Sequence, residues 1–431
     1  MGIFSSNKTP ETPLPNFALH LATDQEHIFK PNDTVSGHVS INPAIPITPQ
    51  AVEISFWGQS MVWIRESHQS HAGNNSTRRY HHYRDNAAFF TVTYNLMRTP
   101  QVLEPGQNHD FRWEFRVPEG TSIIRNGCYQ NDNDERWTTY PHPLPPTFLF
   151  GSSPEDPDCA TISYGVTARL ICPSVGVGKN FDPLSSTANI LFQPLNPDPE
   201  TPLNAPLGLV RYPKRFTLSS SLLSGASTSS IGFRQRISDK FSSSTPKLDF
   251  EAGLEIPDLL TSGSEFRFRC TFSVLDKSAN VVAIPAVHFR VIKLELLDFT
   301  FARAPRDWSA SSTMSGYQWK DATPPPLASA FSGQESTVYD ERKTLLNAVP
   351  GERVVQLEEI PAGEKKETVQ ADKCEVWFTG RVPGNTPSSF RSFAVSRMYR
   401  IKVRLAVEVG SGGKKFEMEA ESHVREVRSA P

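Results

Sequence analysis

The sequence predicts an all-β protein made of two antiparallel β-sandwich domains joined by a linker, and three observations carry that prediction. Proline makes up 36 of 431 residues, above the roughly 5% average, and proline is excluded from helix interiors. Several segments alternate apolar and polar residues with a period of two, which is typical of strands with one buried face. No run of three helical turns carries capping signals. Many short strands separated by Gly/Pro turns are typical of β-sandwiches.

Three segments alternate strongly enough to predict half-buried strands of antiparallel sheets. Apolar residues occupy every second position in 111–117, 266–274 and 399–409, with mostly polar or charged residues between them. A one-residue slip in such a strand would move its whole apolar set into solvent, so the register of these strands is strongly specified.

Weaker alternation places further strands around these three. Turn signals such as Pro105-Gly106 and Pro383-Gly384-Asn385 separate them. The expected strands are 16–22, 34–41, 51–65, 88–97, 161–171, 187–193, 248–256, 281–301, 352–360, 374–380 and 415–427.

The segment 197–247 interrupts this pattern and predicts a flexible basic linker. Four prolines stand in its first ten residues, and 11 of the 29 residues from Thr217 to Thr245 are serine, so it would bury too little apolar area to fold alone. Serines near Arg234 and Arg236 leave open a tether that is regulated by phosphorylation.

The expected organisation follows from this linker. A flexible tail covers 1–15, an N-terminal sandwich covers 16–196, and a C-terminal sandwich covers 248–428. A second proline-rich stretch, 305–350, is expected to form a long loop inserted into the second sandwich.

Charge and cysteine content exclude several classes of protein. The 44 basic and 46 acidic residues nearly cancel, so the chain offers no overall field to nucleic acid. Five scattered cysteines without a C-x-x-C pair argue against a disulfide framework and favour reduced thiols. The N-terminus lacks a signal-peptide apolar core, and the apolar stretch 281–301 carries too many charges to cross a bilayer cheaply. We therefore expect a cytoplasmic protein.

One targeting pattern stands at the N-terminus. Met1-Gly2-Ile3-Phe4-Ser5-Ser6 satisfies M-G-x-x-x-[ST], which makes Gly2 a candidate for myristoylation. A single acyl chain gives only marginal membrane binding, so the expected contact is peripheral, at the plasma membrane or endosomes. An unmodified N-terminus is the alternative.

A polar segment, 66–86, holds the main group of potential metal ligands, namely His68, His71, His81 and His82. A loop does not bring positions i and i+3 together, and no cysteine or carboxylate completes a set at a known spacing. We therefore expect a solvated hairpin loop and no metal. No G-x-S-x-G, P-loop or G-x-G-x-x-G occurs, so the sequence predicts neither an enzyme nor a bound cofactor.

Four blocks in the first half resemble, in order, the arrestin N-terminal domain. The first, 28–39, contains Pro31-Asn32-Asp33 where the family has Pro-Gly-Asp, and asparagine is the next best residue for a positive φ. The blocks 51–58, 103–118 and 144–170 are similar to the strands that follow. The second half, with its ending at 399–416, resembles an arrestin C-terminal domain.

The resemblance implies the arrestin fold, which has two immunoglobulin-like antiparallel β-sandwiches, and a non-catalytic adaptor function. α-Arrestins, or arrestin-related trafficking adaptors, bind membrane transporters or receptors and recruit a HECT-type ubiquitin ligase, whose WW domains bind P-P-x-Y motifs. The implied function is a scaffold that links membrane cargo to ubiquitin-dependent endocytosis and protein trafficking.

The sequence departs from this family in two places. No P-P-x-Y occurs, because Pro145-Pro146-Thr147 is followed by Phe148, so any contact with a ligase is expected to be indirect. A phosphate-sensitive latch is not expected either, since Ala188 stands where visual-type arrestins have an arginine.

The resemblance puts the segment 66–86 near a loop between two central strands that contacts receptors. Arginine side chains there would suit an acidic or phosphorylated tail of a cargo protein. The candidate cargo-binding residues are Arg78, Arg79, Tyr80, His81, His82, Tyr83 and Arg84. A hairpin tip without a partner is the alternative.

Two other functions stay open. An arrestin-fold scaffold could serve sorting or coat assembly without a ubiquitin ligase. A β-sandwich hydrolase or carbohydrate-binding module would need paired carboxylates or an aromatic platform. The seven tryptophans could supply such a platform, although Trp113 lies in a core register.

Overall fold

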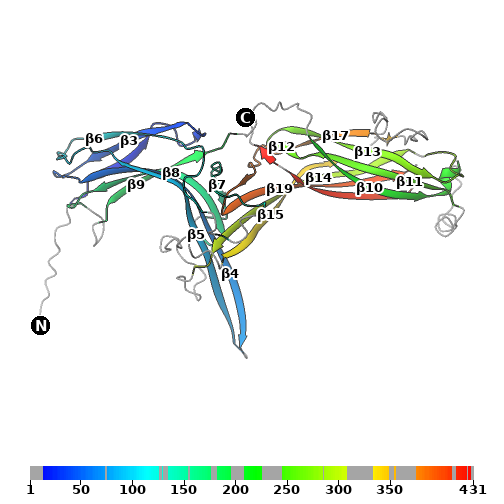
Figure 1. Cartoon of the computed structure of the whole chain (residues 1–431), viewed down its shortest axis with the longest axis horizontal. Helices are drawn as coiled ribbons and strands as arrows, with labels where there is room; N and C mark the ends of the chain where they lie inside the picture. Colours follow the sequence, from blue (N-terminus) through cyan, green and yellow to red (C-terminus); the bar gives the residue numbers. More distant parts are fainter. Residues whose placement is uncertain are drawn as a thin grey trace. The chain divides into compact units, whose positions relative to one another are not determined.

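The computed structural model describes residues 13–72, 75–125, 129, 134–153, 156–175, 182–195, 208–225, 245–284, 286–307, 333–348, 354–355, 375–409, 414–424 and 426–428. Apart from one 3-10 turn, η1 (Ser221–Ser224), the regular elements in these ranges are all β-strands (Figure 1). The all-β prediction is therefore confirmed. None of the described residues belongs to a helix that is long and apolar enough to span a membrane.

The chain divides into two compact units. Unit 1 comprises 1–197, 300–338 and 390–396, and unit 2 comprises 198–299, 339–389 and 397–431. The sequence predicted two continuous halves, yet two short segments of the second half belong to unit 1. Aromatic side chains explain this for 390–396, because the ring of Phe393 lies 5.2 Å from that of Phe89, and Phe390 lies 5.1 Å from Phe148. The start of 300–338 contributes Ala302 and Ala304 to the same core.

Unit 1 is a sandwich of two sheets. The first has the order β1-β3-β6, and the second has the order β2-β9-β8-β4-β5 with β7 paired to β8. The bounds are β1 (Asn16–Leu21), β2 (Ile28–Phe29), β3 (Thr34–Asn42), β4 (Ala51–Ala72), β5 (Asn75–Asn95), β6 (His109–Arg116), β7 (Phe148–Phe150), β8 (Cys159–Ile171) and β9 (Leu184–Phe192). The rings of Phe56 on β4 and Phe115 on β6 lie 5.4 Å apart between the sheets, as facing layers of a sandwich require.

The strands of the second half also pack face to face. One sheet has the order β10-β11-β13-β17, another has the order β15-β14-β19-β18 with β16 on β14 and β20 on β19, and β12 pairs with β21. The bounds are β10 (Leu209–Ser219), β11 (Lys247–Pro257), β12 (Leu259–Thr261), β13 (Glu265–Lys277), β14 (Val287–Pro305), β15 (Gly333–Ala348), β16 (Val354–Val355), β17 (Glu375–Arg381), β18 (Phe390–Arg391), β19 (Val395–Val409), β20 (Lys414–Val424) and β21 (Glu426–Arg428). Phe289 on β14 contacts Phe272 on β13, with ring centroids 5.7 Å apart.

The three strongly alternating segments are confirmed as strands β6, β13 and β19. In β13, Phe266, Phe268 and Cys270 are buried while the arginines between them are exposed or half-buried. The alternation predicted these strands because each has one face on a sandwich core and the other in solvent.

Two expectations about loops are wrong in part. Leu209–Ser219, inside the predicted linker, pairs along β11 as β10, and its Phe216 ring lies 5.4 Å from Phe250. Gly333–Ala348, inside the predicted 305–350 loop, forms β15 beside β14. Serine and proline content concealed the strand pattern there. The linker is also described at 208, 220–225 and 245–247, and the 305–350 segment at 305–307; the rest of both lies outside the described residues. The N-terminal tail, with Gly2, also lies outside them apart from 13–15.

The backbone at two turns agrees with the sequence. Asn32 has φ 71° and Gly106 has φ 72°, which is the left-handed region that glycine and asparagine adopt most easily. The expectation that Asn32 takes over the role of a glycine is therefore confirmed.

Gly58 marks a register shift between β4 and β5. Gly58 pairs with Phe90 but Gln59 pairs with Ala88, so Phe89 is an extra residue in β5, as in a β-bulge. A Cβ atom at Gly58 would lie 2.6 Å from the Tyr164 ring and 2.7 Å from the Phe90 ring. Tyr164 is fixed, since it is buried and its hydroxyl donates to the carbonyl oxygen of Pro145 at 2.6 Å.

We expect Gly58→Ala to lower the free energy of unfolding by about 1–3 kcal/mol, because the added methyl group overpacks a site that cannot relax. Denaturant unfolding of the full chain would measure this. Gly208→Ala is the matched control, since the nearest atom to its added Cβ lies 3.7 Å away, and it should change stability by less than about 0.5 kcal/mol. Equal effects of the two variants would contradict the packing argument.

Candidate functional site

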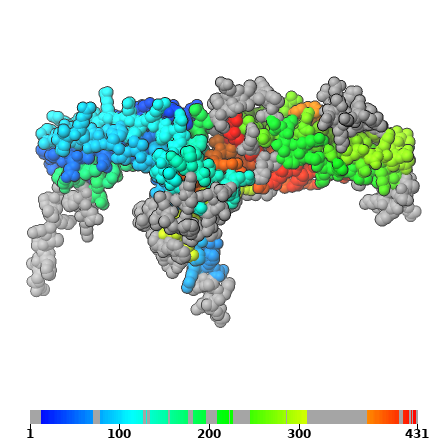
Figure 2. Space-filling model, in the orientation of Figure 1, coloured from blue at the N-terminus to red at the C-terminus, as the bar shows by residue number. Residues whose placement is uncertain are grey.

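The β4–β5 hairpin extends beyond the sheet that carries it. β4 pairs with β8 only as far as Trp63, which lies opposite Cys159, while its pairing with β5 continues to Ala72 opposite Asn75. Residues 64–72 and 75–83, called the outer ribbon from here on, therefore form a two-stranded extension (Figure 1). Part of it is visible as a blue projection in the space-filling view (Figure 2).

The sequence predicted a solvated hairpin loop over 66–86. The hairpin is present, but its described residues belong to the strands β4 and β5 and not to a loop, so that part of the prediction is wrong. Of the seven candidate cargo-binding residues, Arg78 and Arg79 are exposed, and Tyr80 and His81 are half-buried. The other three are buried, with 1% of His82, 7% of Tyr83 and 1% of Arg84 exposed. A partner can therefore meet the first four.

Strand alternation gives the outer ribbon two chemically different faces. Neighbouring residues of a strand point to opposite faces, and directly opposite residues share a face. Arg65 lies opposite His82, and Glu66 lies opposite His81. Arg65, Arg78 and Tyr80 thus share one face, here named the cation face, and Glu66, His68 and His81 share the other, named the imidazole face.

On the cation face, two guanidinium groups surround one aromatic ring. The Cζ atoms of Arg65 and Arg78 lie 5.7 Å and 5.9 Å from the ring centroid of Tyr80. Arg65 also lies 3.7 Å from a carboxylate oxygen of Asp158. Arg78 is the more exposed of the two arginines.

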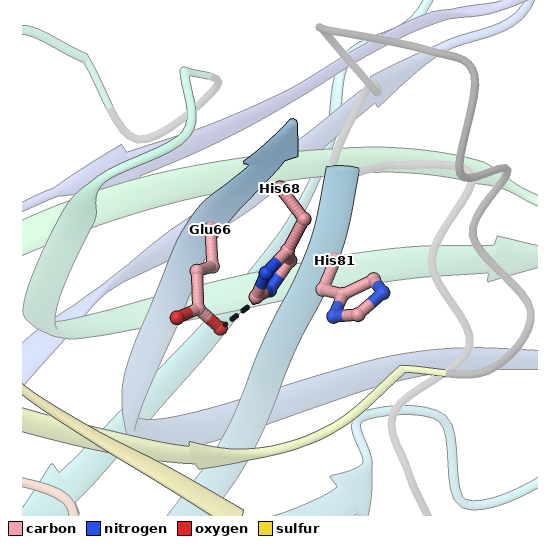
Figure 3. A group of neighbouring side chains, drawn as sticks. All are labelled: Glu66, His68 and His81. Atoms are coloured by element: carbon pink, nitrogen blue, oxygen red, sulfur yellow. Dashed lines mark ion pairs between the residues drawn. The ribbon is translucent and has the colours of Figure 1, made fainter. Parts of the chain in front are cut away.

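On the imidazole face, one carboxylate and two imidazole rings meet (Figure 3). His68 Nε2 lies 3.2 Å from Glu66 Oε2, and the rings of His68 and His81 lie 4.3 Å apart. The ligand atoms of the three residues all lie within 4.8 Å of one another. The sequence missed this group because Glu66 and His81 come together only through the register of the strands.

The other histidines of this segment do not join the group. His82 lies on the opposite face, where its Nδ1 accepts a hydrogen bond from Trp63 Nε1 at 3.0 Å. The side chain of His71 lies outside the described part of the structure.

Buried ion pairs hold the base of the hairpin. Arg84 Nε donates to Asp307 Oδ2 at 2.6 Å, and the backbone N–H of Asp307 donates to the carbonyl oxygen of His82 at 2.8 Å. One residue along β5, Asp85 accepts two hydrogen bonds from Arg125, at 2.7 Å and 2.9 Å.

Tyr129 completes the second of these groups. Its hydroxyl donates to Asp85 and accepts a hydrogen bond from Arg125 at 2.8 Å. Burial, followed by the charge of Asp85, raises the pKa of Tyr129 well above its usual value, so the hydroxyl stays protonated as a donor. The base of the hairpin is therefore a set of paired charges rather than a reactive site.

Three cysteines of the described part, Cys159, Cys172 and Cys270, are buried. Burial raises the pKa of the Cys159 thiol to about 11, which keeps it protonated and a poor nucleophile at neutral pH. Cys128 and Cys374 lie outside the described residues.

Residues 18–124 match the family described as Arrestin (or S-antigen), N-terminal domain. The match begins within β1 and contains the whole of β4 and β5, so the hairpin lies inside the part of the chain that is similar to arrestin N-terminal domains. The resemblance noted in the first three sequence blocks is thereby confirmed, while the fourth block, 144–170, lies outside the match. No curated protein sequence matches the chain.

We expect Arg84→Ala to lower the free energy of unfolding by about 3–5 kcal/mol, because it leaves the buried carboxylate of Asp307 without its guanidinium partner. Arg79→Ala is the matched control on the same strand, and removal of its exposed side chain should cost less than about 0.5 kcal/mol. Chemical denaturation of both variants measures the difference. An Arg84 variant as stable as the wild type would contradict the assigned ion pair.

Proposed function

We propose that this arrestin-like protein is a non-catalytic adaptor that binds cytoplasmic segments of membrane transporters or receptors and links them to ubiquitin-dependent endocytosis and trafficking. The arrestin N-terminal match supports a scaffold or adaptor in general. The identity of the bound segment follows from the chemistry of the hairpin.

The observation that carries the proposal is the exposure of Arg78 and Arg79 on the outer ribbon. No third strand pairs with β4 beyond Trp63 among the described residues, so the edge of the ribbon is open there, and the exposed side chains of Arg78 and Arg79 are accessible to a peptide. Adjacent arginines point to opposite faces of a strand. A peptide that crosses the edge of the ribbon can therefore contact both Arg78 and Arg79. Guanidinium groups form bidentate hydrogen bonds with phosphate and carboxylate, so the favoured cargo is an acidic or phosphorylated tail.

Tyr80 adds a second element to this surface. Its ring is half-buried between the guanidinium groups of Arg65 and Arg78, so it holds the stem of Arg78 in place and reduces the entropy lost when a partner binds. The buried residues His82, Tyr83 and Arg84 support the ribbon from its base and are not part of the proposed contact.

The connection to ubiquitin is the least direct step of the proposal. The chain has no P-P-x-Y motif, so the ligase would be reached through another protein. The same absence favours a second candidate function, a sorting or coat-type scaffold that binds cargo without a ubiquitin ligase. In either case the protein would act on the cytoplasmic side and meet the plasma membrane or endosomes through its cargo.

We expect Arg78→Ala/Arg79→Ala to weaken capture of detergent-solubilised membrane proteins about 30-fold, since two exposed charge-assisted contacts contribute about 1 kcal/mol each. The measurement is affinity capture with the full chain at low and high salt. Added salt should weaken wild-type binding, because surface ion pairs are screened.

The matched control for this experiment is Arg112→Ala/Arg116→Ala, which removes two exposed arginines from β6. It should leave capture unchanged. Phosphatase treatment of the membrane fraction should reduce capture of a phosphorylated tail and leave capture of a carboxylate-rich tail unchanged. Capture that survives the ribbon substitutions would remove the outer ribbon from the site. Ligase peptides in the captured material favour the first function, and coat subunits without ligase favour the second.

A further inference from the structure

The imidazole face holds a ligand set that the proposed adaptor function does not use. Glu66 and His68 come from β4, and His81 comes from β5 directly opposite Glu66. A residue pair at i and i+2 on one strand and a third residue across from them is the arrangement by which a two-stranded ribbon brings three side chains to one point. Figure 3 shows the three side chains on the same side of the two strands.

We propose that Glu66, His68 and His81 bind a zinc ion that joins the two strands of the outer ribbon. Zinc binds imidazole nitrogen at about 2.0–2.1 Å and carboxylate oxygen at about 2.0–2.2 Å, so two ligand atoms of a tetrahedral site lie roughly 3.4 Å apart. The 3.2 Å between His68 Nε2 and Glu66 Oε2 already matches such an edge. His81 reaches the same point by a side-chain adjustment, since all three ligand atoms lie within 4.8 Å.

Neighbouring groups prepare the ligands for a metal. The hydroxyl of Tyr83 donates to Glu66 Oε2 at 3.3 Å, and such a second contact orients a ligating carboxylate. Burial lowers the pKa of His81, and Arg306, His68 and Arg79 lower it further while Glu66 acts in the opposite direction. A lowered pKa favours the neutral imidazole, which is the form that binds zinc.

The same surroundings select the kind of metal. Arg306 and Arg79 make the site unfavourable for a cation that is held by charge alone, as Ca²⁺ and Mg²⁺ are. Two imidazoles and one carboxylate instead suit zinc and its neighbours in the transition series, whose bonds to nitrogen compensate for the nearby positive charge. Three protein ligands leave the fourth position of a tetrahedral site to water.

A bound zinc would stabilise the part of the hairpin that has least support. A two-stranded ribbon is only marginally stable in water, and the pairing of β4 with β8 ends at Trp63. The metal would fix the register of β4 against β5 and so the spacing of Arg78 and Arg79 on the ribbon. The site itself requires no cargo.

The test uses the full chain, free of any histidine tag and of metal, titrated with zinc chloride in a calorimeter. We expect one-to-one binding by the wild type and at least a tenfold loss of affinity in His68→Ala and in His81→Ala. Glu66→Gln, which keeps the size of the side chain and removes its charge, should also weaken binding. Affinity should decrease as the pH falls, because protons compete with zinc for imidazole nitrogen.

The chain offers a matched control in a second pair of stacked histidines. His20 on β1 and His38 on β3 lie directly opposite each other with ring centroids 4.7 Å apart, but His20 Nε2 lies 3.2 Å from Ser40 Oγ instead of a carboxylate. His38→Ala should bind zinc like the wild type. Cobalt should give the strong visible absorption of a tetrahedral site in the wild type and in this control.

Hydrogen exchange gives a second readout that does not depend on affinity. Zinc should slow exchange of backbone amides in the outer ribbon of the wild type and leave His68→Ala/His81→Ala unaffected. Circular dichroism should confirm that the double variant is folded, as expected for half-buried and exposed side chains. If the folded double variant binds zinc with wild-type affinity, the assignment is wrong.

Discussion

The outer ribbon depends on the buried ion pair between Arg84 and Asp307. The pair lies where the hairpin extends beyond Cys159, the first residue of β8, and the backbone hydrogen bond from Asp307 to His82 is its neighbour. A buried guanidinium that loses its carboxylate costs several kcal/mol, so the direction of the hairpin and the position of the segment after β14 are coupled. Next to this contact, Arg306 lies opposite Tyr83. Besides burial, the positive charge of Arg306 there contributes to the lowered pKa of His81.

Alternation of apolar residues predicted those strands that have one face on a core, and this explains both its success and its failure. β6, β13 and β19 each bury one row of side chains, so their pattern is visible in the sequence. In the outer ribbon, residues 65–69 and 78–81 are exposed or half-buried, so the sequence there is polar on both faces and similar to a loop. Arg84 is buried because it pairs with Asp307, which lies 223 residues further along the chain. No local sequence pattern indicates so distant a partner.

The candidate site was harder to predict because it depends on which residues share a face. His81 and His82 are neighbours in the sequence, yet one lies on the imidazole face and the other is buried against Trp63. His68 meets His81 across the hairpin, at a sequence separation that only the register defines. The residue types were visible in the sequence, whereas their grouping required the pairing of β4 with β5.

The extra residue at Phe89 determines which residues of β4 and β5 lie opposite each other in the outer ribbon. Toward the open end of the hairpin, Gly58 pairs with Phe90, and beyond the shift Gln59 pairs with Ala88. Without it, Glu66 would lie opposite His82 rather than His81, and Arg78 and Tyr80 would join Glu66 and His68 on one face. A one-residue irregularity in the core of unit 1 thus decides which side chains the distant tip presents together. Pairing without the bulge would exchange the partners on both faces without altering any residue of the tip.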